Sequence, residues 1–156
     1  MLRRFLKILG ASVLFVALAP LTALADDSEF EADLEPGQEV VVPVGSEGEG
    51  EAEFTVKRDR VRYKLEWEDL TSNAIAGHIH CAVAGVNGPV GVTLIHEAKG
   101  PDGRVRGSFT APDPGNGCGW ATLSDVLAAM VTGNAYVNVH SVNFPAGEIR
   151  GQVEID

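Results

Sequence analysis

Positive charge is scarce in this sequence. Its 156 residues include 12 lysine and arginine residues against 22 aspartate and glutamate residues, which gives a net charge of −10. Residues 26–156 hold nine basic residues against all 22 acidic ones, a net charge of −13. Such a surface repels nucleic acid and anionic lipid, whereas it attracts cations and basic partners or simply keeps the protein soluble. We therefore predict no nucleic-acid partner.

Motifs for several common chemistries are absent. The sequence has no G-x-S-x-G motif, which carries the nucleophile of many hydrolases, and no glycine-rich phosphate-binding motif before a helix. The loop that starts at Asp113 lacks the spacing of oxygen ligands in a calcium hand. The remaining carboxylates are scattered over the sequence, and we interpret them as solvated surface.

Long apolar runs are also missing after residue 25. The first run, from Ile8 to about Leu21, follows a basic start and precedes Ala23-Leu24-Ala25. A basic start, a short apolar core and an A-x-A end are typical of a secretory signal peptide. The run is short for a membrane span, which needs about 20 residues, although an uncleaved anchor remains the alternative. We predict a signal peptide over 1–25 and one exported domain over 26–156, periplasmic, secreted or on the cell surface, with no membrane span.

The pattern of the domain is that of short strands. Val61, Tyr63, Leu65 and Trp67 alternate with charged residues, which is typical of a half-buried antiparallel strand. Similar alternating or apolar segments, separated by turn residues, occur at 30–34, 40–44, 52–56, 76–82, 90–96, 104–110, 134–141 and 148–155.

Only one segment has helical spacing. Leu123, Val126, Leu127 and Met130 recur at the period of a helix, and Thr122 or Ser124 can cap its start. We predict an all-β fold: an antiparallel β-sandwich or a flattened Greek-key barrel of about eight strands, with one short helix.

Cysteine is limited to Cys81 and Cys118. An even number of cysteines in an exported protein favours a disulfide. The alternative is that Cys81 binds a metal, because it follows two histidines directly. We expect the disulfide, and we expect Trp120 to pack beside it.

The four histidines are the strongest candidates for chemistry. His78 and His80 are two positions apart, so a strand would place both imidazoles on one face. His140 ends a later strand and faces the same side as Tyr136 and Asn138 if that strand alternates. Three imidazoles without carboxylates suit copper or zinc rather than magnesium or calcium. His96 is either an ordinary strand-end residue or a fourth ligand.

Six stretches of the sequence form a set of spaced motifs: 30–34 (FEADL), 37–40 (GQEV), 77–80 (GHIH), 85–90 (GVNGPV), 135–140 (AYVNVH) and 145–152 (PAGEIRGQ). Together they resemble the CHRD domain, named for its occurrence in chordin. The resemblance covers roughly 30–153. It implies a secreted β module of immunoglobulin size that acts by binding, as the chordin domains accompany the binding of extracellular signalling proteins; bacterial members mostly have no assigned activity. The sequence departs from the common pattern at Cys81 and His96.

A looser likeness is to the sandwich of copper–zinc superoxide dismutase. That protein also has an H-x-H pair on one strand, another histidine near the end of a later strand, and an arginine in its closing strand, to which Arg150 is similar. The long loops with the zinc ligands have no counterpart here. Pattern likeness does not carry function.

Three functional hypotheses follow. The first is a non-enzymatic binding module whose ligand is an unknown extracellular protein or a metal ion, with one copper or zinc ion on His78, His80 and His140. The second is a copper-dependent redox enzyme in which Arg150 steers an anion to the metal. The third is an interaction module with purely structural histidines.

Overall fold

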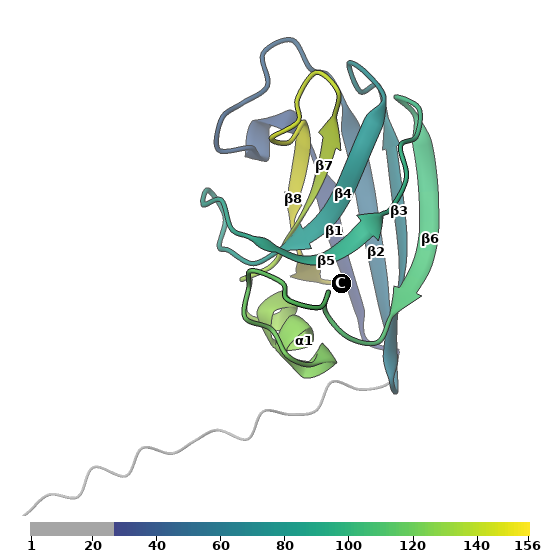
Figure 1. Cartoon of the computed structure of the whole chain (residues 1–156), viewed down its shortest axis with the longest axis vertical. Helices are drawn as coiled ribbons and strands as arrows, with labels where there is room; N and C mark the ends of the chain where they lie inside the picture. Colours follow the sequence, from purple (N-terminus) through teal and green to yellow (C-terminus); the bar gives the residue numbers. More distant parts are fainter. Residues whose placement is uncertain (1–26) are drawn as a thin grey trace, which may run out of the picture.

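The computed structural model describes residues 27–156, so the predicted signal peptide over 1–25 lies outside the described residues. The described chain forms two antiparallel sheets that face each other (Figure 1). The predicted β-sandwich is therefore confirmed, and the two open sheets distinguish it from a closed barrel. No helix in residues 27–156 has the length and apolar character needed to cross a membrane.

The first sheet has the strand order β6-β3-β2-β1-β9, and the second has the order β5-β4-β7-β8. The strands are β1 (Glu29–Leu34), β2 (Glu49–Lys57), β3 (Arg60–Glu68), β4 (Ala74–His80), β5 (Val90–Ile95), β6 (Gly103–Phe109), β7 (Tyr136–Ser141), β8 (Ile149–Gln152) and β9 (Glu154–Ile155). A short 3-10 helix, η1 (Pro36–Gln38), follows β1, and the α-helix α1 (Leu123–Val131) lies at one end of the sandwich (Figure 1).

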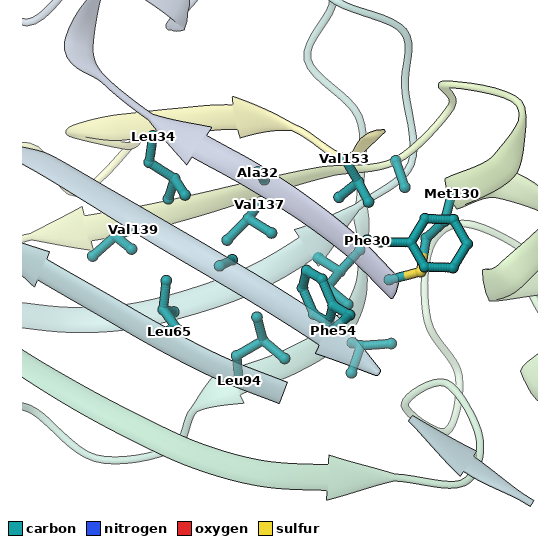
Figure 2. Packing of buried hydrophobic residues seen from close by; sticks show 14 of the residues in the cluster. Phe30, Ala32, Leu34, Phe54, Leu65, Leu94, Met130, Val137, Val139 and Val153 are labelled. Carbon is teal, nitrogen blue, oxygen red and sulfur yellow. The ribbon is translucent and has the colours of Figure 1, made fainter. Parts of the chain in front are cut away.

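The core lies between the two sheets. Alternation in β3 buries Val61, Leu65 and Trp67 toward it, as the sequence pattern predicts. Side chains from both sheets meet there, with Met130 of α1 closing one end (Figure 2). The helix starts at a capping box in which the Thr122 N–H donates to the Asp125 carboxylate (2.8 Å).

The apolar run over Val40–Val44 is not a strand. It lies in the connection between β1 and β2, where Val41 is 82% exposed and Val44 is 92% exposed. β1 pairs with β2 on one side and, at Phe30 and Glu31, with β9 on the other, and the run itself pairs with no strand among the described residues. Hydrophobicity alone does not reveal whether a strand partner exists.

The predicted strand over 148–155 is divided into two. β8 belongs to the second sheet, and β9 pairs with β1 in the first. Val153 lies buried between them, so the chain changes sheets at this residue. This exchange places β8, with Arg150, beside β7 in the sheet that carries the histidines.

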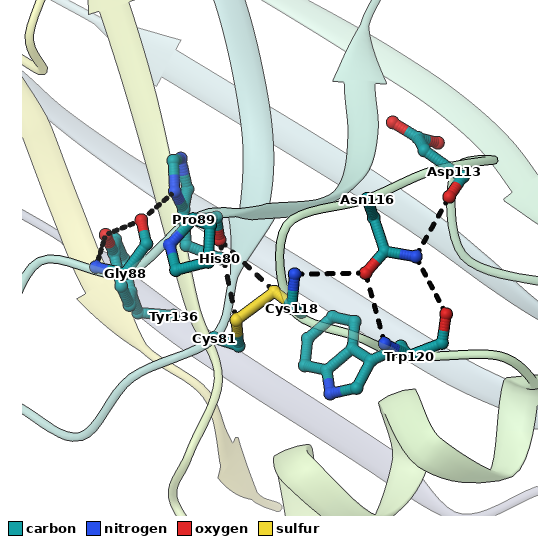
Figure 3. Close-up of a disulfide and its surroundings, with 9 residues drawn as sticks. All are labelled: His80, Cys81, Gly88, Pro89, Asp113, Asn116, Cys118, Trp120 and Tyr136. Carbon is teal, nitrogen blue, oxygen red and sulfur yellow. Dashed lines mark hydrogen bonds between the residues drawn. A yellow bond between two sulfur atoms is a disulfide. The ribbon is translucent and has the colours of Figure 1, made fainter.

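The predicted disulfide is present between Cys81 and Cys118. It joins the end of β4 to the loop before α1 (Figure 3). Trp120 lies in this loop and packs on Gly91 at the start of β5, where an added Cβ would come within 2.1 Å of the indole. Cys81 is thereby removed from the candidate metal ligands.

The disulfide gives the first testable prediction. Replacing both cysteines, Cys81→Ser with Cys118→Ser, removes a cross-link between residues 37 positions apart. The chain-entropy model predicts a loss of about 3 to 4 kcal/mol in the free energy of unfolding, because the unfolded chain gains freedom. Urea denaturation of the variant and of oxidised wild type measures it. Reduced wild type should match the variant, and a variant as stable as oxidised wild type would contradict the prediction.

Candidate metal centre

The three predicted histidines lie together on the outer face of the second sheet. β4 and β7 are antiparallel neighbours in which His80 lies opposite Tyr136 and His78 lies opposite Asn138. Directly opposite residues point to the same face of a sheet, and His140 follows Asn138 by two positions on that face. One nitrogen from each of the three histidines lies within 4.8 Å of the others.

Hydrogen bonds to backbone carbonyls fix two of the imidazoles. The Nδ1–H of His80 donates to the carbonyl of Gly88 (2.9 Å), and the Nδ1–H of His140 donates to the carbonyl of Pro145 (3.0 Å). Both neutral rings therefore keep a lone pair on Nε2. The Nε2 of His140 lies 3.2 Å from the Nδ1 of His78, and the Nε2 of His80 is buried without a partner among the described residues. Metal-binding histidines in proteins are held in this way.

The ring of His80 packs on a stack formed by Tyr136 and Arg150. The ring of Tyr136 lies parallel to that of His80, with centroids 4.8 Å apart, and the guanidinium of Arg150 lies 3.5 Å from the centre of the Tyr136 ring. Gly88 joins the two rings, because its N–H donates to the Tyr136 hydroxyl while its carbonyl accepts from His80 (Figure 3). A Cβ at Gly88 would lie 2.0 Å from the carbonyl oxygen of Cys81, so only glycine fits there.

Arg150 packs on the ring of Tyr136 and is only 1% exposed. Its guanidinium donates to the carbonyl of Val83 (3.2 Å) and to Asn87 (3.4 Å) in the loop that follows β4. That Arg150 steers an anion to a metal stays a prediction. The contacts that the structure does give Arg150 hold the ring of Tyr136 and the loop above it.

Burial favours the neutral forms of His78, His80 and His140. Burial, reinforced by the neighbouring imidazoles, lowers the pKa of His78 from 6.5 to about 4. Burial likewise lowers the pKa of His80 to about 4, although its bond to the Gly88 carbonyl opposes the shift. The pKa of His140 is also lowered by burial. Neutral imidazole is the form that binds metals.

Sequence reasoning did not find Glu39. This carboxyl lies in the connection after η1, is only 9% exposed and accepts a hydrogen bond from the Nδ2 of Asn138, 99 residues away. Burial raises its pKa to about 7, against the opposing attraction of Arg150 and the bond from Asn138. A buried carboxyl and a buried arginine thus lie beside the histidines, and the sequence signal for the carboxyl is its place in the stretch 37–40 (GQEV), which resembles the CHRD domain.

His96 does not join the cluster. It follows β5, is exposed and lies outside the group of three whose nitrogens converge. The structure thus brings together His78, His80 and His140 and leaves the fourth histidine apart. His96 is consequently a suitable control position for experiments on the other three.

The lowered pKa values can be measured directly. In the metal-free protein, the ring-proton NMR signals of His78 and His80 should titrate with midpoints near pH 4, because protonation requires a charge in a buried position. A midpoint near 6.5 for His80 would show that its ring is not buried as described.

Glu39 gives a second pH prediction, because its pKa is shifted upward whereas those of the histidines are shifted downward. Its pKa is about 7 in the folded protein and near 4.5 when unfolded, so it lowers stability as pH rises from about 4.5 to above 7. Glu39→Gln, which mimics the protonated form, should change the free energy of unfolding little at pH 5 and raise it relative to wild type at pH 8. Urea denaturation at the two pH values tests this. An equal difference at both pH values would contradict the shifted pKa.

Comparison with known proteins identifies the family of the domain. The model of the CHRD domain family matches residues 30–153, which is nearly all of the described chain. No curated protein and no solved structure matches the sequence. The match agrees with the motifs that flank the histidines and contain Arg150. The chain therefore belongs to the CHRD domain family.

Proposed function

We propose that this protein is an exported CHRD-domain binding module that holds one copper or zinc ion through His78, His80 and His140. The observation that carries the proposal is the convergence of three neutral imidazoles whose ligand nitrogens lie within 4.8 Å of one another. Metal–nitrogen bonds near 2 Å allow nitrogens up to about 4 Å apart to share an ion, so small side-chain adjustments are sufficient.

The chemistry of the ligands supports copper or zinc. Imidazole nitrogens suit these ions, whereas magnesium and calcium prefer oxygen. Protons compete with a metal for the same lone pairs, and pKa values of about 4 at His78 and His80 remove this competition at neutral pH. The carbonyls of Gly88 and Pro145 supply the outer hydrogen bonds that metal-binding histidines need.

The export part of the proposal has separate support. A disulfide is typical of oxidising compartments outside the cytoplasm. The segment over 1–25 has the three parts of a secretory signal. The family assignment and the acidic composition of 26–156 agree with an extracytoplasmic module.

Binding is favoured over the two rival functions. A redox enzyme with Arg150 as its anion guide would need the guanidinium to face incoming substrate, but this group is buried against Tyr136. A purely structural role would be expected to pair the ring nitrogens fully. The unpartnered Nε2 of His80 favours a ligand for that atom instead.

Metal analysis of protein isolated from the exported fraction tests the proposal. Wild type should contain about one copper or zinc ion per chain, and His80→Gln should lose most of it, because three-ligand sites weaken strongly when one ligand is removed. His96→Gln is the matched control and should keep the metal. His140→Gln provides a second ligand variant, and circular dichroism checks that each variant is folded. Equal metal content in wild type and both ligand variants would refute the site.

A further inference from the structure

We propose that Asp113 is a positioning residue of the metal centre: its carboxylate accepts the Nε2–H of His78 when the metal occupies Nδ1. The inference rests on the proposed function and deepens it, because it adds a charged residue to a set of three neutral ligands. Three independent features of the structure support it: the strand register, the construction of the loop that carries Asp113, and the protonation of the histidines.

The register places Asp113 on the side of His78 that faces away from His140. β4 lies between β7, which carries His140, and β5, which carries Thr93. Thr93 lies directly opposite His78, so the two side chains share the outer face. The Thr93 hydroxyl donates to the Oδ2 of Asp113 at 2.6 Å. The carboxylate is thereby held beside His78, and its negative charge acts on that ring.

The loop that carries Asp113 is rigidly constructed. The backbone N–H of Asp113 donates to the carbonyl of Gly91 on β5 (2.9 Å), and the backbone carbonyl of Asp113 accepts from the side chain of Asn116 (2.9 Å). Asn116 in turn accepts from the N–H groups of Cys118 and Trp120 (Figure 3). Cys118 is bonded to Cys81, the residue after His80. The position of the Asp113 carboxylate is therefore coupled to the strand of the histidines.

The protonation of the three rings explains why such a group is needed. Because His140 donates its Nδ1–H to the carbonyl of Pro145, its Nε2 is an acceptor, and the 3.2 Å contact requires His78 to donate from Nδ1. A metal bound at the Nδ1 of His78 displaces this proton. The ring stays neutral if a proton is taken up at Nε2 through solvent as the first one leaves, so no net proton is released from the ring.

At Nε2, the metal-bound form of His78 therefore presents an N–H, whereas the metal-free form presents a lone pair. Ligand histidines almost always donate this second N–H to a carboxylate, a carbonyl or water. Gly88 and Pro145 provide carbonyls for the other two rings. Asp113 provides the corresponding acceptor for His78, and its charge also favours a divalent cation in the centre.

Zinc affinity measured by chelator competition on the full mature protein tests the assignment. Asp113→Asn removes the charge at constant shape, and Thr93→Val removes the hydroxyl that holds it. Both should weaken Zn²⁺ binding by about 10- to 100-fold, the usual effect of losing an outer-shell partner. Thr93→Ser keeps the hydroxyl, and Glu97→Gln removes an exposed charge in the connection after β5. Both of these controls should stay within about threefold of wild type.

Imidazole nitrogen NMR of the zinc-bound protein separates positioning from a general structural effect. In wild type the Nε2–H of His78 should be protected from solvent exchange, and Asp113→Asn should remove this protection while leaving the His80 and His140 signals in place. Unchanged affinity and protection in Asp113→Asn would overturn the assignment. Changes at all three rings would overturn it in favour of a structural role of the loop.

The two proposals fail in distinguishable ways. If wild type and His80→Gln both bind no zinc or copper, the metal centre is refuted and the role of Asp113 falls with it. If wild type binds zinc through the histidines and Asp113→Asn binds it equally well, only the role of Asp113 is refuted.

Discussion

The antiparallel pairing of β4 with β7 is the constraint on which the candidate site depends. Ile79 on β4 and Val137 and Val139 on β7 are fully buried between the sheets, so the hydrophobic core fixes which residues point outward. A slip of one residue would turn every side chain of a strand to the opposite face. The burial energy of the core thus maintains the register, and the register places the imidazoles side by side.

The polar side chains on this outer face carry a cost in desolvation free energy, and this cost bears on their function. Arg150 is buried among them, Glu39 nearly so, and burial holds the imidazoles neutral. Desolvation offsets most of the attraction between buried charges, so apolar residues in these places would stabilise the fold as well or better. A layer of this composition is difficult to explain by stability alone. The proposed metal site would give the unpartnered nitrogen of His80 a ligand.

Strand periodicity was sufficient to predict the fold class, the shared face of His78 and His80, and the presence of His140 on that face. The prediction was wrong for the run over Val40–Val44, because a strand is defined by its partner as much as by its own residues. The contact of Glu39 with Asn138 could not be predicted, since it spans 99 residues and follows no period. The sequence does not connect Asp113 with the histidines, because its hydrogen-bond partner Thr93 comes to lie opposite His78 only through strand pairing.

The position of the disulfide gives it a local role beside its effect on global stability. A domain of this size buries enough apolar surface to fold without a cross-link. The bond lies next to His80 and ties the end of β4 to the loop that holds Asp113. Both cysteine sulfurs also lie near the carbonyl of Pro89, the residue after Gly88, whose own carbonyl orients His80. One covalent bond therefore restrains the loops on both sides of the histidines, so the outer face keeps its geometry although it lies outside the hydrophobic core.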